Sequence, residues 1–293
     1  MKEKRKITKK TNKMNKYKAE ETLLYIDKLS VGYGEKDASG KEKLILQNVS
    51  LIEKDIIREG ISATGQIISF LGRSGRGKST LFKALTGLVK PTSGQILISN
   101  LSSEDTSDAK VVSEGDIGFV DQKYTLFRHK TVMEICHYAL RQNKASKEEK
   151  IALIEKYLSE WGLSEHKDKY SCELSGGQRQ RCAIIEQMLT SKHFMILDEP
   201  FSGLDIGNIE KVKESFNRIL NDNEYNTIIF STHDIRLAVE LSDSIYILGF
   251  PEGETVSTIV KHFDLKEMGL AWTEYGNGHR TLVNEIKELL LKS

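Results

Sequence analysis

The stretch IISFLGRSGRGKSTLFKALTGL, residues 67–88, determines the fold that we expect for this chain. It consists of an apolar run, a glycine-rich loop that fits the pattern G-x-x-x-x-G-K-[ST], and a run that is compatible with a helix. A strand, a tight loop and a helix in this order form the structural context of a phosphate-binding loop. The stretch therefore predicts an α/β protein built around a site for a polyphosphate.

The loop residues have the chemistry that phosphate binding requires. Glycines allow the backbone to point successive N–H groups inward, and the helix that follows presents its N-terminus to an anion. Lys78 can reach the β- and γ-phosphates, and the Ser79 hydroxyl can ligate Mg2+. A glycine-rich turn that ends in Lys-Ser by chance is the weaker alternative, because average composition rarely produces this pattern. The residues that we expect to hold the nucleotide are Gly72, Arg73, Ser74, Gly75, Arg76, Gly77, Lys78, Ser79 and Thr80.

The run FMILDEP, residues 194–200, is an apolar strand that ends in two carboxylates. Parallel strands deliver the side chains at their carboxyl ends to one edge of a sheet. Asp198 is suited to hold Mg2+, directly or through Ser79, and Glu199 is suited to polarise an attacking water. Taken alone, the pair would be two solvated acids at a strand end. The phosphate loop upstream makes the functional interpretation the stronger one.

A second strand-like run, TIIFS at residues 227–231, is followed by Thr232, His233 and Asp234. A histidine at a strand end usually has only a local hydrogen-bonding role. Because this strand is expected to lie beside the other two, we interpret His233 as a residue aimed at the γ-phosphate.

The segment LSGGQRQR, residues 174–181, has no evident structural role of its own. Its two glycines precede a run that is compatible with a helix to about residue 189. The N–H groups that begin such a helix attract anions. The alternative is a glycine hinge before a helix.

Together these motifs make the chain similar to an ATP-binding cassette ATPase, specifically the nucleotide-binding subunit of a membrane transporter, over about residues 23–248. The resemblance implies an α/β fold with a P-loop NTPase core, an antiparallel β subdomain and an inserted α-helical subdomain. It identifies residues 72–79 as the Walker A loop, residues 175–178 as the signature and residues 202–205 as the D-loop. The remaining matched positions are the Q-loop glutamine Gln122, the Walker B residues Asp198 and Glu199, and the switch histidine His233.

The resemblance also implies roles for these residues. In this family the signature faces away from its own phosphate loop and binds the ATP of a second subunit, so each homodimer would hold two composite sites that hydrolyse the β–γ bond. Tyr33 stands where the family places an aromatic that stacks on adenine, with Tyr17 and Tyr25 as nearby alternatives. The other expected residues are the nucleotide contacts Ser175, Gly176, Gly177, Gln178 and Asp205, the catalytic Glu199, His233 and Gln122, and the Mg2+ ligands Ser79, Gln122 and Asp198.

The partners implied by the resemblance are a second nucleotide-binding subunit, transmembrane permease subunits and, for an importer, a solute-binding protein. The expected location is peripheral, on the cytoplasmic face of the cell membrane. We favour import over export because the chain resembles compact single-cassette subunits. The alternatives are a non-transport ABC ATPase and a nucleotide-gated regulatory subunit. The sequence lacks the long coiled coil of DNA-repair relatives and the second cassette of translation factors.

Composition sets the broad class of the protein. Hydrophobic residues at 39% and charged residues at 29% are ordinary for a globular chain. The 43 Lys and Arg residues against 42 Asp and Glu leave a net charge of +1, so no overall field favours a nucleic-acid partner. No apolar run approaches the roughly 20 residues of a membrane helix, and we recognise no secretory signal. Three cysteines without metal spacing indicate a reducing compartment.

We divide the chain into three parts. Residues 1–20 form a basic tail that we expect to be disordered, with contact to anionic lipid as the alternative. Residues 21–250 form the ATPase domain, whose helical subdomain at about 123–173 is expected to dock the permease through helices near residues 131–143 and 147–163. Residues 251–293 form an extension. Its strand at 257–263 and helix at 282–292 are expected to pack on the domain, with a partner contact as the alternative.

Two features depart from the family pattern. Residues 52–64 lengthen a connection that the family usually makes in a few residues, which leaves the register of the strand before Walker A open. Glu186 stands where relatives commonly have arginine, and we expect it to alter the packing behind the signature.

Overall fold

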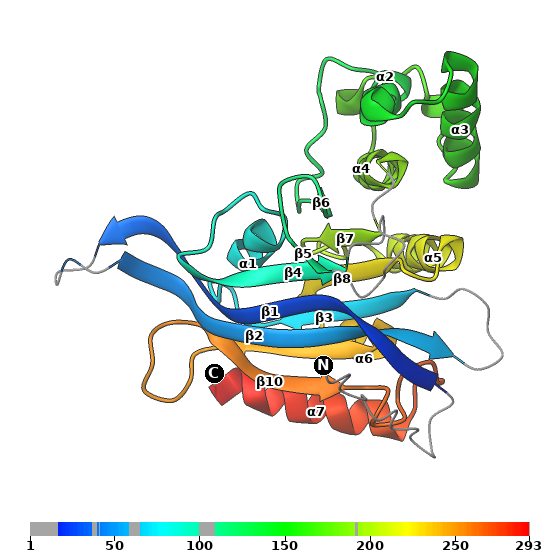
Figure 1. Cartoon of the computed structure of the whole chain (residues 1–293). Helices are drawn as coiled ribbons and strands as arrows, with labels where there is room; N and C mark the ends of the chain where they lie inside the picture. Colours follow the sequence, from blue (N-terminus) through cyan, green and yellow to red (C-terminus); the bar gives the residue numbers. More distant parts are fainter. Residues whose placement is uncertain are drawn as a thin grey trace, which may run out of the picture.

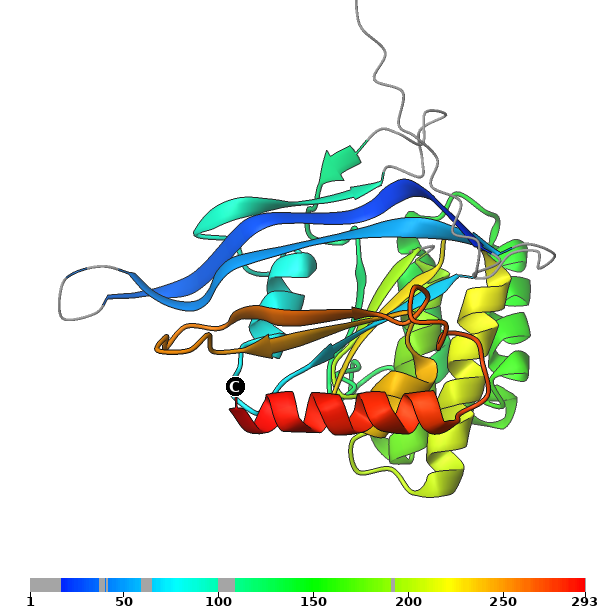
Figure 2. The same cartoon turned by 90° about the horizontal axis from the view of Figure 1, so that it is seen from below.

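The computed structural model describes residues 17–36, 40, 42–58, 65–99, 109–190 and 193–292. Two β-sheets form the body of the protein, and a helical subdomain projects from it (Figure 1). Seen from below, the smaller sheet, the helix α1 (Lys78–Leu85) and the larger sheet lie in successive layers (Figure 2). Residues 1–16 of the predicted tail lie outside the described residues. The strand β1 (Tyr17–Lys36) begins within the range predicted as tail, so the domain starts before residue 21.

The larger sheet has six strands, all parallel except the one at its outer edge. In spatial order they are β10 (Thr258–Asp264), β9 (Ser244–Gly249), β3 (Gln66–Leu71), β8 (Thr227–Thr232), β7 (Phe194–Leu197) and β6 (Gly118–Val120). β3, β7, β8 and β9 are buried along their whole length, as is usual for parallel strands covered on both faces. The strands predicted before the phosphate loop, before the two carboxylates and before His233 are therefore neighbours in one sheet.

The smaller sheet is antiparallel and consists of β2 (Glu42–Arg58), β1, β4 (Ser93–Ser99) and β5 (Ala109–Val111). Residues 52–58, which the sequence assigns to an unusual insertion, continue β2, and Arg58 pairs with Tyr17. Residues 59–64 lie outside the described residues. β3 then pairs with β8 in an unbroken parallel register from Gln66 to Leu71. The insertion thus lengthens the β1–β2 ribbon and leaves the register of β3 intact.

The helix α1 packs between the two sheets. Its side chains Leu81, Phe82 and Leu85 are fully buried in a cluster that also contains residues of β1, β4 and β3. Phe82 lies edge-on to Phe70 of β3, with ring centroids 5.8 Å apart. Burial of these large apolar side chains fixes the start of α1, and therefore the phosphate loop, against β3.

The helical subdomain has its own core. It contains α2 (Val132–Ala139), η1 (Leu140–Gln142), α3 (Lys147–Glu160), η2 (Ser164–His166), η3 (Ser171–Glu173) and α4 (Gly176–Leu189). The helices α2 and α3 agree with the two predicted from apolar spacing, and both begin with a capping box, Thr131 with Glu134 and Ser146 with Glu149. Buried residues of α2, α3 and α4 pack together with β6 and β7. The subdomain is therefore attached to the body through α4 and its neighbours.

The remaining helices cover the larger sheet. α5 (Ile206–Asp222) follows β7, and α6 (Ile235–Leu241) follows β8. α7 (Asn277–Lys292) buries Leu282 and Ile286 in a cluster with residues of α6 and β9. This is the packing on its own domain that the apolar face of the predicted C-terminal helix indicates.

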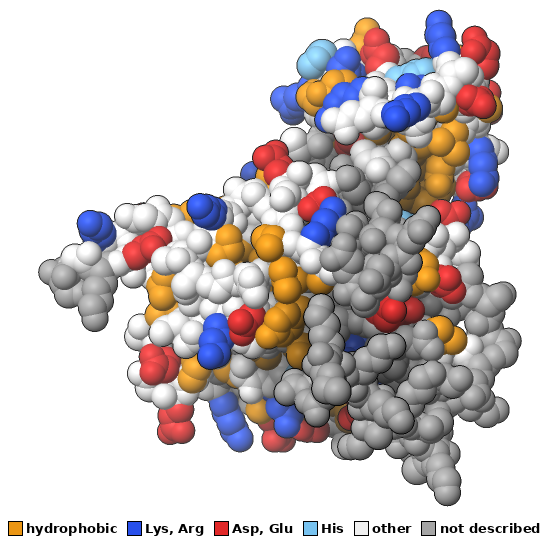
Figure 3. Space-filling model, viewed as in Figure 1, with side chains coloured by type: hydrophobic (Ala, Val, Ile, Leu, Met, Phe, Trp, Pro, Cys, Tyr) orange, Lys and Arg blue, Asp and Glu red, His pale blue; other side chains and the backbone are white. Residues whose placement is uncertain are grey.

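A row of apolar side chains crosses the outer face of the smaller sheet. Ile52, Tyr25, Leu97 and Val111 are successive cross-strand neighbours on β2, β1, β4 and β5. Figure 3 shows hydrophobic side chains over the face that these strands present. The alternate residues of the same strands point inward to the cluster around α1.

The residues of the insertion contact the C-terminal extension at a buried polar junction. Tyr246 of β9 donates a hydrogen bond from its hydroxyl to Glu53 of β2 at 2.7 Å, and both side chains are buried. His262 of β10 stacks on the Tyr246 ring at 4.3 Å. The guanidinium of Arg58 lies 4.5 Å from the ring of Trp272. The two segments that extend the family pattern therefore pack on each other and on β9.

We predict that Tyr246→Phe destabilises the protein by about 2 kcal/mol, because a buried carboxylate loses a hydrogen-bond donor. The free energy of unfolding from urea titration measures the effect. Tyr138→Phe is the control, since Tyr138 is 40% exposed on the helical subdomain and the change should have little effect. Equal free energies for the Tyr246 variant and the unaltered protein would contradict a stabilising role for this junction.

Candidate functional site

Three neighbouring strands end at one edge of the larger sheet. β3 leads into the phosphate loop, β7 leads into Asp198 and Glu199, and β8 leads into His233. The parallel register places Leu71 beside Thr232 and Leu197 beside Phe230. The carboxyl edge of a parallel sheet is the usual position of a ligand site in such folds.

The phosphate loop is folded around Lys78. The Nζ of Lys78 donates to the carbonyl oxygen of Gly72 at 2.7 Å and lies 4.0 Å from Oε1 of Glu199. Burial lowers the pKa of Lys78, and the negative charges of Glu199 and Asp198 oppose this shift. Gly77 has a φ of 84°, and a Cβ there would lie 2.7 Å from a methyl group of Leu46, so this turn requires glycine.

The N-terminus of α1 is suited to an anion. It has no side-chain cap and no acidic residue in its first turn. The first N–H groups of a helix lack intrahelical acceptors, so they are available to a ligand, and the helix dipole favours negative charge there. This geometry supports the expected contacts of the loop with phosphate oxygens.

Asp198 is held between two hydroxyl groups. Ser79 donates to Oδ2 of Asp198 at 2.7 Å, and Ser231 donates to Oδ1 at 2.5 Å. The first contact joins the end of β7 to the phosphate loop, and the second joins it to β8. Two of the three residues predicted to bind Mg2+, Ser79 and Asp198, therefore lie side by side.

Glu199 is held in position by β8 and the histidine that follows it. Its backbone N–H donates to Oγ of Ser231 at 2.9 Å, and its Oε2 is 2.9 Å from Nδ1 of His233. Glu199 has a φ of 52°, a left-handed conformation that costs on the order of 1–3 kcal/mol for a residue other than glycine. The hydrogen bond that the Glu199 N–H donates to Ser231 helps to keep this conformation, which aims the carboxylate along the sheet edge.

Ser231 is a site residue that the sequence interpretation did not identify. It contacts both carboxylate residues, yet it lies inside the run that was interpreted only as a strand. The one available signal was a serine among the otherwise apolar residues IIF of that strand. Its role depends on the register in which β7 pairs with β8, which the sequence did not specify.

The side chains present fit a magnesium ion bound together with phosphate. Mg2+ prefers oxygen ligands and is usually held by one or two protein groups and the substrate's phosphates. Ser79 and Asp198 supply such oxygens. Gln122 lies exposed just beyond β6 at the same sheet edge, and within the described ranges no hydrogen bond joins its side chain to these two. Among the described residues no cluster of three or more His, Cys, Asp or Glu side chains offers another metal site.

The structure distinguishes between the candidate adenine-stacking tyrosines. Tyr33 is 49% exposed, and its hydroxyl lies 3.4 Å from Oγ1 of Thr80 in α1. Tyr25 lies within the apolar row on the outer face of the smaller sheet. The side chain of Tyr17 lies outside the described residues. Of the two candidates whose side chains are described, Tyr33 is thus the one that lies beside the phosphate loop.

The remaining loop residues face solvent to different degrees. Arg73, Ser74 and Gly75 are exposed, whereas Arg76 is half-buried. The guanidinium of Arg76 stacks on the ring of Phe250, 3.7 Å from its centroid. This contact gives Arg76 a packing role beside any role in binding.

The signature begins α4 with a capping box. Oγ of Ser175 accepts a hydrogen bond from the backbone N–H of Gln178 at 3.3 Å, and Oε1 of Gln178 accepts one from the backbone N–H of Ser175 at 2.8 Å. The Ser175 hydroxyl keeps its own proton for donation. A Cβ at Gly176 would meet nothing within 4 Å, so the start of α4 faces open space. Ser175 and the exposed N–H groups can therefore bind an anion that comes from outside this chain.

The signature and the phosphate loop lie on different parts of the molecule. α4 packs on α2, α3 and β6, whereas α1 packs on β1 and β2 (Figure 1). The phosphate loop has a cation and oxygen ligands, and the signature has hydroxyl and N–H donors. Within one chain these two sets of groups therefore lie apart.

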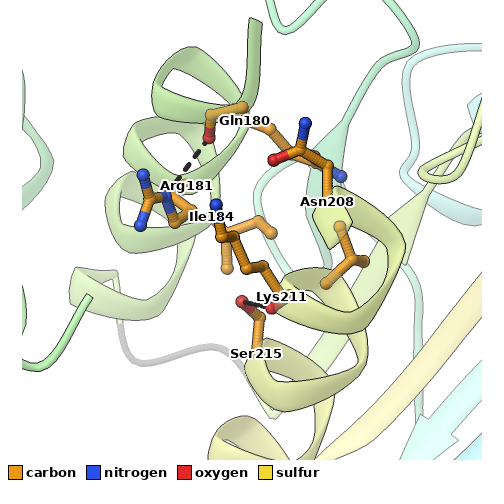
Figure 4. A pocket seen from close by; sticks show the side chains of 8 residues that line it. Gln180, Arg181, Ile184, Asn208, Lys211 and Ser215 are labelled. Atoms are coloured by element: carbon orange, nitrogen blue, oxygen red, sulfur yellow. Dashed lines mark hydrogen bonds between the residues drawn. The ribbon is translucent and has the colours of Figure 1, made fainter. Parts of the chain in front are cut away.

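The residue Asp205, expected to contact nucleotide, caps α5. Its Oδ1 accepts from the backbone N–H of Asn208 at 2.8 Å, and its Oδ2 accepts from the side-chain amide of Asn208 at 2.9 Å. Asn208 also lines a small cavity of about 20 Å³ between α4 and α5, together with Gly177 and Arg181 (Figure 4). The volume holds no more than a water molecule. The cavity lies where α5, which follows the D-loop residues 202–205, meets α4, which begins at the signature.

A larger groove of about 780 Å³ separates the helical subdomain from the body. The residues that line it include Glu114, Phe127, Tyr138, Arg141, Glu186 and Gln187. The rings of Phe127 and Tyr138 meet edge-on at 5.2 Å, and both are exposed. Burial raises the pKa of Glu186 to about 7, and the positive charge of Arg141 opposes the shift. Glu186, which departs from the family pattern, is therefore a half-buried residue that lines an accessible groove.

Among the described residues, none of the helices combines the length and the apolar character needed to cross a bilayer.

Comparison with protein families and curated proteins gives consistent matches. Residues 61–202 match the family model described as ABC transporter. The sulfate/thiosulfate import ATP-binding protein CysA of Synechococcus elongatus is 36% identical over 201 residues, which are 69% of this chain and 57% of that protein. CysA 2 of Rhizobium meliloti is 37% identical over 205 residues, 69% of this chain and 54% of that protein. The chain therefore spans less than two thirds of the length of these relatives.

Solved structures have the same fold. The cbiO1 protein of Clostridium perfringens, part of an ABC transporter complex, superposes with a TM-score of 0.66 at 25% identity and covers 86% of this chain and 92% of that one. A dimeric ATP-binding cassette in a post-hydrolysis state, bound to ADP and Pi, has a TM-score of 0.63 at 25% identity, covering 83% and 99%.

We predict that Ser231→Ala lowers the kcat for ATP hydrolysis about tenfold, because the Asp198 carboxylate and the Glu199 backbone N–H each lose a hydrogen bond that positions them. Steady-state phosphate release measures the change. The matched control is Ser69→Ala on the adjacent strand β3, because Ser69 is buried and its Oγ has no hydrogen-bond partner among the described residues. Equal rates for the two variants would contradict a positioning role for Ser231.

We predict that Glu186→Gln stabilises the protein at pH 8 by about 2–3 kcal/mol and has little effect near pH 4.5. The pKa of Glu186 is raised in the folded state, so its contribution to stability falls as pH rises from 4.5 through about 7. The glutamine side chain does not ionise, so the variant does not lose this stability as the pH rises. Urea titration at several pH values gives the difference from the unaltered protein. The exposed groove residue Glu114 provides the control Glu114→Gln, a surface substitution for which little effect on stability is expected.

Proposed function

The chain belongs to the ATP-binding cassette (ABC) transporter family, and from that premise we propose that it binds and hydrolyses ATP as the nucleotide-binding subunit of an ABC importer. The observation that carries the proposal is the division of the site into two halves. The phosphate loop with Lys78, and the signature with Ser175, present complementary groups on separate parts of the chain. Two copies related by a twofold axis would complete two such sites.

In the proposed reaction, the chain's main work is to position groups and stabilise charge. The N–H groups of the phosphate loop and Lys78 bind the β- and γ-phosphates of ATP, and Tyr33 stacks on the adenine. Ser79 and Asp198, with Gln122, would hold Mg2+, which when bound neutralises charge on the phosphate oxygens. The existing contact between Ser79 and Asp198 supports this assignment.

Glu199 acts on the attacking water. Its carboxylate accepts a proton from the water as the water oxygen forms a bond to the γ-phosphorus and the bond from that phosphorus to the bridging oxygen breaks. ADP leaves with the electron pair of the broken bond. His233, in contact with Oε2 of Glu199, keeps the carboxylate oriented toward the phosphate.

Dimer closure couples this reaction to movement. Ser175 and the first N–H groups of α4 bind the γ-phosphate held by the other copy, so ATP joins the two subunits. Hydrolysis removes the shared group and favours the open state. We propose that the groove beside α2 and α4 receives a segment of a permease, which places the protein on the cytoplasmic face of the membrane. Exposed aromatic side chains in that groove support a protein partner.

The direction of transport is proposed as import. The relatives described above are named as import proteins, and the match with them includes the ATPase motifs. The proposed site contacts only the nucleotide, so we propose that other subunits select the transported solute. A solute-binding protein would deliver it.

We predict that Glu199→Gln lowers ATP turnover by about a hundredfold or more and traps a dimer with ATP and Mg2+, because the water is no longer activated while phosphate binding persists. Light scattering coupled to size exclusion measures the mass, and phosphate release measures turnover. Lys78→Ala is the companion variant, and it should bind ATP weakly and stay monomeric. A Glu199→Gln protein that remains monomeric at saturating ATP and Mg2+ would overturn the shared-site proposal.

A further inference from the structure

The signature glutamine has a hydrogen-bond partner that the motifs do not include. Nε2 of Gln178 lies 2.9 Å from Nε2 of His166, the last residue of η2 in the helical subdomain. We propose that His166 is a positioning residue for the signature, and that through Gln178 it holds Ser175 in the geometry that receives the phosphate of a second copy. The proposal rests on the two-copy site argued above and adds a residue that controls its assembly.

The orientation of the Gln178 amide follows from its second contact. The backbone N–H of Ser175 can only donate, and it lies 2.8 Å from the Gln178 side chain, so the atom there must be the oxygen Oε1. The amide nitrogen of Gln178 therefore faces His166. An amide nitrogen can only donate, so Nε2 of His166 must accept, and the imidazole is neutral with its proton on Nδ1.

A histidine at position 166 destabilises the fold unless its Nε2 accepts a hydrogen bond. Nδ1 of His166 is buried and, in the part of the chain that the structure describes, has no hydrogen-bond partner. An unpaired buried donor disfavours the folded state, and an aliphatic side chain would avoid it. The contact to Gln178 is the one polar interaction that the described residues offer to this imidazole. The imidazole of His166 therefore leaves Nδ1 unpaired among the described residues, while its Nε2 contacts the signature.

The contacts form a chain that ends at the phosphate-binding donors. His166 fixes the Gln178 amide, the amide oxygen fixes the backbone of Ser175, and the backbone N–H of Gln178 donates to Oγ of Ser175. Ser175 has the φ of −64° and ψ of 165° of a helix cap, which places its hydroxyl at the open start of α4. Without His166 the amide can rotate, and the cap exchanges among several geometries.

The proposal separates two binding events. ATP binding to one copy uses the phosphate loop, which lies on another part of the molecule. Closure of two copies uses Ser175. A defect at His166 should therefore weaken the dimer and leave the affinity of one copy for ATP unchanged.

The test uses the full chain with Glu199→Gln, so that hydrolysis does not dissolve the complex. Into this parent we introduce His166→Leu, which removes the acceptor, and His166→Gln, whose amide oxygen reaches about as far from Cβ as Nε2 of the imidazole. Analytical ultracentrifugation with saturating ATP and Mg2+ gives the dimer dissociation constant. We expect an increase of about tenfold for His166→Leu, one lost hydrogen bond in each of two sites, and less than about threefold for His166→Gln.

A double-mutant cycle with Gln178→Ala tests the route of the effect. If His166 acts through Gln178, then His166→Leu should produce no further weakening in the Gln178→Ala background. The cycle also distinguishes this role from packing, because a defect in packing would persist there. ATP titration of the monomers should give equal affinities for all variants.

Two results would overturn the proposal. One is a dimer as tight with His166→Leu as in the parent, and the other is equal weakening by His166→Leu and His166→Gln, which would indicate a steric role. Failure of the Glu199→Gln parent to dimerise is a different result, since it would refute the two-copy site itself before His166 is tested. Thermal melting of each variant detects loss of folding. If His166→Leu does not fold, the proposal requires that His166→Gln retains the dimer.

Discussion

The position of Asp198 between two hydroxyl groups is the constraint on which the site depends. Ser79 holds one oxygen from the phosphate loop, and Ser231 holds the other from β8. Both contacts require β3, β8 and β7 to be parallel neighbours in register, and that order is maintained by strands buried on both faces. The arrangement joins three segments that are distant in the sequence at one sheet edge. Glu199 and Lys78 then have little freedom, because their neighbours are already fixed.

The helix α4 connects the signature to the groove beside α2. Its first residues are the signature, and its last turns, with Glu186, line the groove beside α2. Fourteen residues of helix span about 20 Å, so a change in the groove and a change at the signature are connected by one rigid element. The cavity between α4 and α5 places Gly177 beside Asn208, the residue that holds Asp205. The signature helix therefore also contacts the segment that follows Walker B.

The sequence predicted the parts of this structure that depend on local pattern. The phosphate loop, the two strands that end in acids and in histidine, and the helices α2 and α3 were identified because turn chemistry, apolar runs and apolar helical spacing are local signals. Ser231 and His166 could not be identified in this way. Their roles come from partners more than ten residues away, through strand pairing in one case and the fold of the helical subdomain in the other. The course of residues 52–58 was also unpredictable, since the register of Arg58 with Tyr17 is set across forty residues of ribbon.

The β1–β2 ribbon shows how the C-terminal extension, which lies away from the phosphate loop, can still affect that loop. The Tyr246 hydroxyl donates a hydrogen bond to Glu53 of the insertion. The Tyr246 ring stacks on the ring of Phe70, with centroids 5.4 Å apart. Phe70 is the second-last residue of β3, and the phosphate loop begins two positions later at Gly72. A Cβ at Gly72 would lie 2.6 Å from the carbonyl oxygen of Leu248 on β9, so the loop starts in direct contact with the strand that carries Tyr246. Because packing at this density transmits small displacements, the insertion and the C-terminal extension together support the strand from which the phosphate loop emerges.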